Sequence, residues 1–192
     1  MDLNEINLSE TKIETARLVL RPFEESDLED FHAYASVAGV GEAAGWKHHE
    51  SMEETAEVLK GIIARRRTLA ITEKESGKVI GSVGLETSPS IFADKDLGEN
   101  INDLGYVISR DYWGKGYAEE AIKGALSLCF YVLHLQAVTC GHFSANRAAR
   151  TIVEKCGFKF VADGKYASAD GVETSARYYA ITHKDFGVEY SD

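Results

Sequence analysis

Apolar residues along the chain follow strand-like and helix-like spacings in turn, and their order predicts the secondary structure. A first strand is predicted at 17–21, where Pro22 ends the run. Two helices follow, because 26–29 and 51–54 both read as capping boxes, with a serine three residues before a glutamate. The second helix ends in arginines at 65–67, which suit the negative end of a helix dipole and are expected to face solvent.

The rest of the chain alternates between short apolar runs and helical spacing. Further strands are predicted at 69–72, 79–85, 104–108, 137–143, 158–162 and 175–181. Helices are predicted at 118–133 and from Asn146 to Cys156, with Gly157 as the terminating residue. Residues 87–101 show neither period and are expected to form a loop.

This order, β-α-α-β-β-β-α-β-α-β-β, predicts an α/β (α+β) protein. Hairpins produce antiparallel pairs, whereas strand–helix–strand crossovers produce parallel ones. We therefore expect one mixed, mostly antiparallel, twisted sheet of about seven strands with helices on both faces. Residues 15–187 are expected to form this single domain, and the polar residues 1–14 to form a lead-in.

The composition is typical of a soluble globular protein and narrows the choice of partners. The 192 residues, 44% of them hydrophobic, suffice for a buried core in one domain. The net charge of -10 disfavours nucleic acid as a partner, since proteins that bind phosphate backbones usually carry a basic surface. The charge suits a cationic amine, although solubility alone also explains it.

The cysteines and the first residues indicate the cell compartment. Three cysteines without a CxxC pair favour neither a disulfide framework nor a zinc site, so no metal is expected. Residues 1–12 lack the basic and apolar regions of a signal peptide, and no apolar stretch is long enough to span a membrane. We therefore expect a cytoplasmic protein with free thiols and no membrane partner.

The most informative segment is 112–118, which reads Tyr-Trp-Gly-Lys-Gly-Tyr-Ala between a predicted strand and a predicted helix. Gly114 and Gly116 let the backbone turn tightly and bring its amides close to a ligand. Amides at a helix N-terminus favour an anion, and Lys115 adds a cation at the rim. The spacing is neither that of a P-loop nor GxGxxG, so it predicts a phosphate or pyrophosphate site of another class. A purely structural turn would also explain the two glycines.

Three segments in this order resemble the GNAT acetyltransferases, and in particular their RimJ/RimL-type branch. Trp-Gly-Lys-Gly-Tyr-Ala, after Gly-Tyr-Val-Ile at 105–108, is similar to the acetyl-CoA-binding motif, with Trp113 where the family usually has Gln or Arg. The segment 15–21 resembles the opening strand of the branch, and 144–158 resembles its asparagine-containing helix. The resemblance, over about residues 13–187, implies direct transfer of an acetyl group from acetyl-CoA to a primary amine.

The resemblance also implies a cofactor site. Amides of the glycine loop are expected to hold the pyrophosphate, and the strand edge to pair with the pantetheine arm like an extra strand. The expected cofactor-binding residues are Val107, Ile108, Ser109, Trp113, Gly114, Lys115, Gly116, Tyr117, Ala118 and Asn146. The amide of Ile108 is expected to polarise the thioester carbonyl, as oxyanion-hole donors do. Asn146 is also expected to cap its helix.

Three side chains are candidates for moving protons, because an amine must lose a proton before it attacks. Asp103 stands ahead of Gly-Tyr, where the RimJ/RimL-type branch often carries an acidic residue. Glu86 ends the preceding strand and is a second candidate base. His142 lies late in a strand expected to approach the thioester, and could serve as acid, as base or as a hydrogen-bonded structural residue.

The resemblance does not identify a general acid. Many relatives carry serine or tyrosine at the positions of Ala149 and Val153, and neither residue here can donate a proton. Either Tyr112, His142 or Tyr178 supplies the proton, or the CoA thiolate leaves unassisted.

The acceptor and the activity leave alternatives open. The amine belongs either to a small molecule or to a protein N-terminus, and segments 36–50 and 87–101 are expected to face it. A homodimer is also left open. Loss of the general acid would fit a non-catalytic acyl-CoA-binding module, and a nucleotide-binding regulator is a third alternative.

Overall fold

The computed structural model describes residues 6–167 and 171–190, which form one mixed sheet in the order β1-β2-β3-β4-β5-β6-β8-β7. Its strands are β1 (Ile13–Glu14), β2 (Leu18–Pro22), β3 (Thr68–Glu73), β4 (Val79–Thr87), β5 (Ile101–Ile108), β6 (Ala137–Phe143), β7 (Lys159–Ala167) and β8 (Glu173–Thr182). Neighbouring strands are antiparallel except β5 and β6, which are parallel. The expected mixed, mostly antiparallel sheet is confirmed, and the two-residue β1 is a strand that the pattern did not predict.

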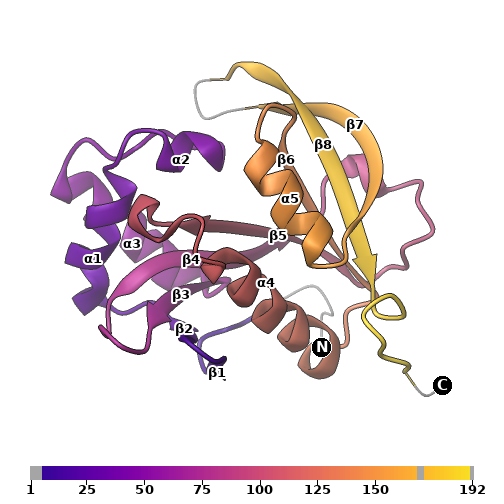
Figure 1. The fold of residues 1–192 in the computed structure, drawn as a ribbon, viewed down its shortest axis with the longest axis horizontal. Helices are drawn as coiled ribbons and strands as arrows, with labels where there is room; N and C mark the ends of the chain where they lie inside the picture. The colour runs from indigo at the N-terminus through magenta and orange to yellow at the C-terminus, as the bar shows by residue number, and fades with distance from the viewer. Residues whose placement is uncertain (1–5, 168–170, 191–192) are drawn as a thin grey trace.

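Helices cover both faces of this sheet, as expected (Figure 1). They are α1 (Leu28–Ala35), α2 (Val40–Ala43), α3 (Met52–Arg65), α4 (Tyr117–Ser127) and α5 (Arg147–Lys155). Leu128–Val132 continues α4 as a π-helical turn, and short 3-10 turns lie at Glu25–Asp27, Ser90–Phe92 and Arg110–Tyr112. No helix within the described residues combines the length and the apolar character that crossing a membrane requires.

Two apolar cores hold the helices on their faces. Ala70 and Ile71 are neighbours in β3, so their side chains point to opposite faces of the sheet. Ile71 packs in a core with Ile122 of α4, and Ala70 packs in a second core with Leu59 of α3. The alternation along β3 therefore separates the α4–α5 layer from the α1–α3 layer.

The two predicted capping boxes have different outcomes. Ser51 does cap α3, since its hydroxyl accepts an amide of the first turn at 3.1 Å. Ser26 does not cap α1, and that prediction is wrong. Asp27 precedes the helix instead, where its carboxylate accepts the amide of Glu24 and binds the guanidinium of Arg21 at 2.7 Å. A partly buried ion pair, which the local pattern does not reveal, holds the chain in place here.

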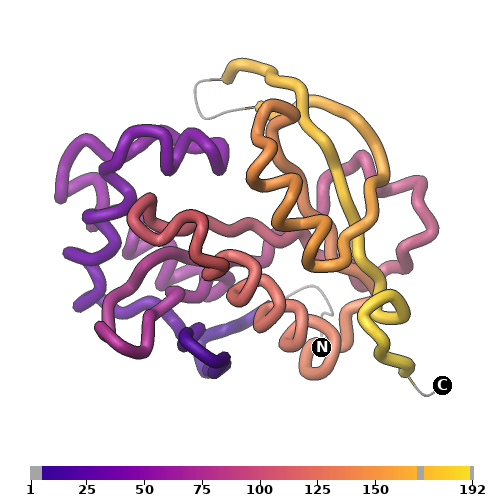
Figure 2. The backbone as a smooth tube through the Cα atoms, viewed as in Figure 1, coloured from indigo at the N-terminus to yellow at the C-terminus, as the bar shows by residue number. Residues whose placement is uncertain are grey.

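The packed core reaches beyond the expected bounds of 15–187. Ile6 and Leu8, ahead of β1, and Val188, after β8, are all buried in the core shared with α4. The traced chain in Figure 2 shows α1 to α3, in indigo and purple, on the opposite side of the molecule from β6 to β8, in orange and yellow.

The middle of the sheet divides where β5 and β6 meet. These strands pair over three positions, the last of which joins Asp103 and Thr139. Beyond this pair β5 continues along β4 to Ile108, while β6 continues along β8 to Phe143, and Figure 1 shows the two strands diverging. We call the divergence after Asp103 and Thr139 the fork. The splay expected at 105–108 is confirmed.

Candidate active site

The glycine loop, residues 113–116, leads directly into α4. Gly114 and Gly116 have φ angles of 72° and 81°, in the left-handed region that favours glycine. Gly116 is the N-cap of α4. A Cβ placed on Gly114 would meet no atom within 4 Å, and a Cβ on Gly116 would meet Nη2 of Arg17 at 3.5 Å, so the described chain leaves the space at Gly114 open.

The amides of this loop point to no protein acceptor. Within the described chain, no hydrogen bond is donated by the backbone amides of residues 114–119, and the first such bond in α4 runs from Glu120 to the carbonyl of Gly116. Open amides at the positive end of a helix dipole form a ready anion site. A diphosphate fits this cradle, because the loop leaves it unfilled and any Cβ there would intrude.

Arg17 supports the loop from the turn between β1 and β2. Its Nε binds Oε2 of Glu120 at 2.7 Å, and its Nη1 donates to the carbonyl of Lys115 at 2.9 Å. The guanidinium also lies 4.2 Å from the centre of the Tyr117 ring. No local pattern indicates this contact, because it joins residues 103 positions apart.

The side chains of the loop are arranged around its open backbone. Trp113 donates from its indole Nε1 to the carbonyl of Ile108 at 2.7 Å, while its ring remains 48% exposed. Lys115 is exposed, and its Nζ lies 5.2 Å from the centre of the Tyr112 ring. Ala118 packs against the main core. The indole bond ties the end of β5 to the loop.

The register of β5 decides which of its amides remain open at the fork. The amide of Ser109 donates to the carbonyl of Ile80 at 2.7 Å, so Ser109 belongs to a hydrogen-bonded pair with β4. Because such pairs alternate in antiparallel strands, the backbone of Val107 also faces β4. The amides of Tyr106 and Ile108 face the opposite, unpaired edge. Of the three residues expected to line the pantetheine, Ile108 therefore has the open amide.

Asp103 lies at the fork itself. Its Oδ1 accepts a hydrogen bond from the Thr139 hydroxyl at 2.6 Å. Burial raises the pKa of Asp103 to about 6, the charge of Glu86 adds to the rise, and the bond from Thr139 opposes it. The carboxylate is thus ionised at neutral pH but has a higher affinity for a proton than an ordinary aspartate.

Glu86 lies opposite Asp103 in the β4–β5 register but in a different environment. Its side chain is 56% exposed and lies 3.8 Å from Nη1 of Arg67. An exposed carboxylate near an arginine remains well solvated. The structure therefore brings the two candidate bases together and distinguishes them by burial.

His142 lies apart from these carboxylates. Thr139 and His142 are three positions apart in β6, so their side chains point to opposite faces of the sheet. The His142 ring stacks on Tyr179 with 5.3 Å between centroids, and its Nδ1 donates to the carbonyl of Phe143 at 2.8 Å. Its Nε2 is buried and has no partner among the described residues. Both the structural role and a proton-transfer role remain compatible with this position.

Two of the candidate acids use their hydroxyl groups elsewhere. Tyr178 donates to the carbonyl of Lys165 at 2.7 Å, and the Tyr112 hydroxyl lies 3.4 Å from Oε2 of Glu73. His142 is then the remaining side-chain candidate, beside an unassisted thiolate.

Asn146 caps α5 as expected. Its Oδ1 accepts the amide of Ala149 at 3.0 Å, and this bond uses only the oxygen of the side chain. The cap therefore leaves the amide nitrogen of Asn146 for a second role.

The segments expected to face the acceptor both approach the fork. In the segment 36–50, a Cβ on Gly45 would lie 2.6 Å from the ring of Tyr166 in β7, and that ring packs 5.5 Å from Phe143 at the end of β6. In the segment 87–101, the Ser88 hydroxyl lies 2.7 Å from the Thr139 hydroxyl. The segment 36–50 thus approaches the aromatic rings at the open end of the fork, and the segment 87–101 contacts its closed end.

The cysteines do not offer a reactive nucleophile. All three are buried, free thiols. Burial raises the pKa of Cys129 and of Cys156 to about 12, so neither forms a thiolate readily. In the parts of the chain that the structure describes, no group of three or more potential metal ligands is found.

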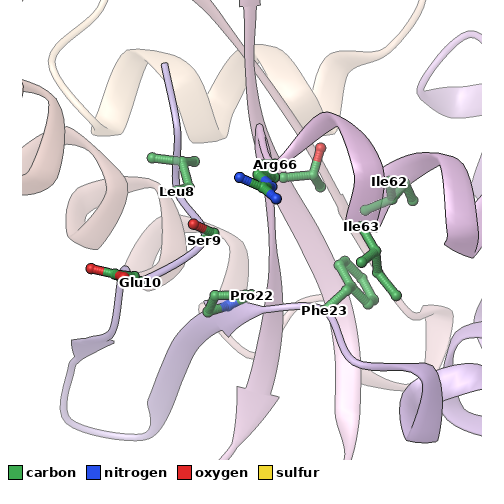
Figure 3. Close-up of a pocket in the computed structure, with 9 residues that line it drawn as sticks. Leu8, Ser9, Glu10, Pro22, Phe23, Ile62, Ile63 and Arg66 are labelled. Carbon is green, nitrogen blue, oxygen red and sulfur yellow. The ribbon is translucent and has the colours of Figure 1, made fainter. Parts of the chain in front are cut away.

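A cavity of about 420 Å³ lies elsewhere, between the residues ahead of β1 and the end of α3 (Figure 3). It is lined by Leu8, Ser9, Glu10, Pro22, Phe23, Ile62, Ile63, Arg66 and Thr68. None of these residues belongs to the glycine loop or to the fork.

Comparison with known proteins identifies the family. Residues 17–159 match the family described as acetyltransferase (GNAT) domain. The chain is 27% identical over 152 residues to the uncharacterized N-acetyltransferase YoaA of Bacillus subtilis, which covers 77% of this chain and 82% of that protein. The chain therefore belongs to the GNAT acetyltransferase family and is an N-acetyltransferase. Enzymes of this family use acetyl-CoA.

Solved structures show the same fold. A GNAT-family acetyltransferase from Bacillus anthracis superposes with a TM-score of 0.78 at 23% identity, over 91% of this chain and 99% of that one. The spermidine N-acetyltransferase from Vibrio cholerae, in complex with CoA and spermine, has a TM-score of 0.73 at 20% identity, over 91% of this chain and all of that one (100%). The expected fold and enzyme class are confirmed. The RimJ/RimL-type branch stays a prediction.

Proposed function

We propose that this enzyme transfers the acetyl group of acetyl-CoA directly to a primary amine, in the manner of the RimJ/RimL-type branch. One observation carries the proposal: the open amides of the glycine loop adjoin a strand edge that pairing leaves free beyond Asp103 and Thr139. An anion cradle beside an open strand edge suits a long ligand with a diphosphate at one end.

The cofactor would be held mainly by backbone groups. Amides of 114–118 would bind the diphosphate, with Lys115 and Trp113 at the rim. The open edge at Ile108 would bind the pantetheine arm, flanked by Val107 and Ser109. Tyr117 and Ala118 begin the helix whose dipole faces the anion, and the free amide nitrogen of Asn146 would donate from the other side of the fork. The bound thioester supplies the acetyl group and a thiolate leaving group.

Asp103 is the proposed base. A half-buried carboxylate with a pKa of about 6 can accept a proton from an acceptor ammonium group and still be ionised at neutral pH. Glu86, being exposed, would instead attract the cationic acceptor towards the fork. The amide of Ile108 would donate to the thioester carbonyl, a contribution of about 10²–10³ in rate for such donors.

The leaving thiolate has two routes. The unpartnered Nε2 of His142 supports a role for this residue in proton transfer on the cofactor side. A thiolate is also a good leaving group, and Ala149 and Val153 offer no proton at the positions where relatives have donors. We keep both routes, and a His142→Phe variant, which retains the stacking on Tyr179, distinguishes them by its kcat.

The acceptor is proposed to be a small-molecule amine or a protein N-terminus. The acidic pair at Asp103 and Glu86 and the aromatic rings of Phe143 and Tyr166 suit an ammonium group. The named activity of the Vibrio cholerae neighbour, on spermidine, supports an amine of the small-molecule kind. We also propose a cytoplasmic location, which the buried free thiols support, a single domain that contains residues 15–187 together with the flanking core residues, and a homodimer as a state to be tested.

The decisive experiment measures thiol release from acetyl-CoA with N-terminal peptides, amino acids and polyamines side by side. Turnover is expected with at least one class of amine, and the acetylated product identifies it by mass. Tight CoA binding without turnover on any amine would contradict acetyl transfer at this site and return the chain to a binding role.

A further inference from the structure

A chain of three hydrogen-bonded side chains runs outward from the fork. Asp103 of β5 accepts from the Thr139 hydroxyl of β6 at 2.6 Å, and that hydroxyl lies 2.7 Å from the hydroxyl of Ser88. Thr139 is completely buried, whereas Ser88 is half-buried in the segment after β4. The chain therefore joins the half-buried carboxylate, through a completely buried hydroxyl, to a second half-buried residue in the segment after β4.

The direction of these bonds follows from the proton count. An ionised carboxylate only accepts hydrogen bonds, so Thr139 donates its single hydroxyl proton to Asp103. The oxygen of Thr139 is then free to accept, and Ser88 donates to it. While Asp103 is ionised, each hydroxyl thus donates to the next group inward. Once Asp103 is protonated, both hydroxyls rotate to donate outward, since either hydroxyl of the Thr139–Ser88 pair can be the donor.

We propose that Thr139 and Ser88 carry the proton that Asp103 takes from the acceptor amine out to solvent. This relay rests on the proposed function of Asp103 as the base. Thr139 and Ser88 act through Asp103 as positioning residues and do not touch the amine.

The step balances. The ammonium group of the acceptor gives one proton to Asp103, and its nitrogen keeps the electron pair with which it attacks. Protonated Asp103 passes a proton to the oxygen of Thr139, while Thr139 passes its own to Ser88 and Ser88 passes its own to water. The second proton of the amine leaves with the thiolate. Acetyl transfer from thioester to ammonium releases one proton overall, and this is the proton that the relay carries.

Such a path becomes useful once the acceptor and the cofactor lie in the fork and cover the half-buried carboxylate of Asp103. Loss of solvent around this carboxylate is already the largest influence on its pKa. Other titratable groups lie near it on neighbouring strands: Glu86 of β4 and Tyr178 of β8 are on the same face of the sheet, whereas Cys140 of β6 points to the opposite face. The Tyr178 hydroxyl donates a hydrogen bond to the backbone carbonyl of Lys165, and burial raises the pKa of the Cys140 thiol. Neither replaces the two hydroxyls as a route outward.

The test compares variants that remove one hydroxyl at a time. Thr139→Val and Ser88→Ala are expected to lower kcat by about tenfold or more, with the KM for acetyl-CoA unchanged. Thr139→Ser should retain kcat because it keeps the hydroxyl. Thr72→Val is the matched control, since Thr72 is a buried threonine of β3 whose hydroxyl has no partner among the described residues.

Two readouts separate a relay from a structural role. Imidazole buffer should restore turnover of Ser88→Ala in a saturable way, because a small base can take the proton at the solvent end. Thr139→Val should move the acid limb of the pH profile upward, since the bond from Thr139 lowers the pKa of Asp103. The relay would be overturned if Thr139→Val and Ser88→Ala both kept the wild-type kcat and pH profile while Asp103→Asn was inactive. The role of Asp103 as the base would then still stand. An active Asp103→Asn would instead overturn the proposed base.

Discussion

Nε of Arg17 binds Oε2 of Glu120 at 2.7 Å, although Arg17 precedes β2 of the sheet and Glu120 lies in the first turn of α4. Glu120 also accepts the amide of Arg17 at 2.7 Å and the hydroxyl of Thr15 at 2.6 Å. Three donors from the turn between β1 and β2 thus converge on one carboxylate in the first turn of α4. The glycine loop is held in place from outside, so its own amides remain free for a ligand.

Arg17→Ala is expected to weaken cofactor binding more than catalysis. Loss of the guanidinium frees the loop, so the KM for acetyl-CoA should rise by about 3–10-fold while kcat changes little. Arg17→Lys should recover only part of the affinity, because an ammonium group cannot hold Glu120 and the Lys115 carbonyl with the same fixed geometry. Steady-state kinetics and calorimetry with CoA measure both effects. Arg65→Ala, at the exposed end of α3, is the control for loss of a surface arginine.

Gly114→Ala tests the anion cradle. The φ of 72° costs any other residue about 1–2 kcal/mol, so some stability is lost whatever the loop does. Gly187→Ala is a matched control, because Gly187 has a φ of 86° and equally open surroundings but lies after β8. Both variants should lose similar thermal stability, and only Gly114→Ala should lose CoA affinity, by about tenfold or more. Equal CoA affinity in the two variants would place the diphosphate elsewhere.

Asp103 should determine the acid limb of the pH–rate profile. With a pKa of about 6, the carboxylate becomes available as a base as the pH rises through that value. The wild-type kcat/KM is expected to rise from pH 5 to pH 7 and then to level off on this limb. Asp103→Asn should lower kcat by about 10²–10⁴-fold and remove the limb. A limb that persists in the variant would show that another group titrates there.

The same carboxyl should leave a signature in stability. Its folded-state pKa is raised above the ordinary value of 3.8, so its contribution to stability is complete below about pH 4 and is lost as the pH rises through about 6. Relative to Asp103→Asn, the wild type should therefore lose about 2 kcal/mol between pH 4 and pH 7. Urea denaturation of both proteins at the two pH values measures this difference.

Asn146 combines two roles that different substitutions separate. Asn146→Asp keeps a good N-cap, so α5 should remain as stable as before. The new carboxylate removes the amide donor and repels an anion, so CoA affinity should fall. Asn146→Ala should lose about 1 kcal/mol of stability in addition. Thermal melts with and without CoA distinguish the outcomes, and unchanged affinity in Asn146→Asp would leave the residue with its cap alone.

The sequence predicted the parts of the site that are local in the chain. The glycine loop, the helix that follows it and the cap at Asn146 are encoded within a few residues each, where backbone rules apply directly. The hairpin of β3 and β4 was predicted for the same reason. Even local rules failed at Ser26, where the partly buried ion pair of Arg21 and Asp27 determines how the chain enters α1.

The contacts that complete the site join distant parts of the chain. Thr139 meets Asp103 because two parallel strands place them opposite each other, 36 positions apart. Neither apolar spacing nor residue type indicates this pairing, because parallel register depends on how the whole sheet packs. The backbone amide of Ile108 is open to a ligand, whereas the amide of Ser109 is bonded to β4. Only the register of β5 against β4 determines this difference.

The fork has a mechanical consequence. Three residue pairs are all that join β5 to β6 in register, so the two halves of the sheet share a short seam at one end and a long open edge at the other. A ligand that forms hydrogen bonds to both open strand edges would connect the two halves of the sheet along the length of the fork. Cofactor binding should then slow the exchange of backbone hydrogens in strands that the ligand itself never touches, because opening one half would require opening the other.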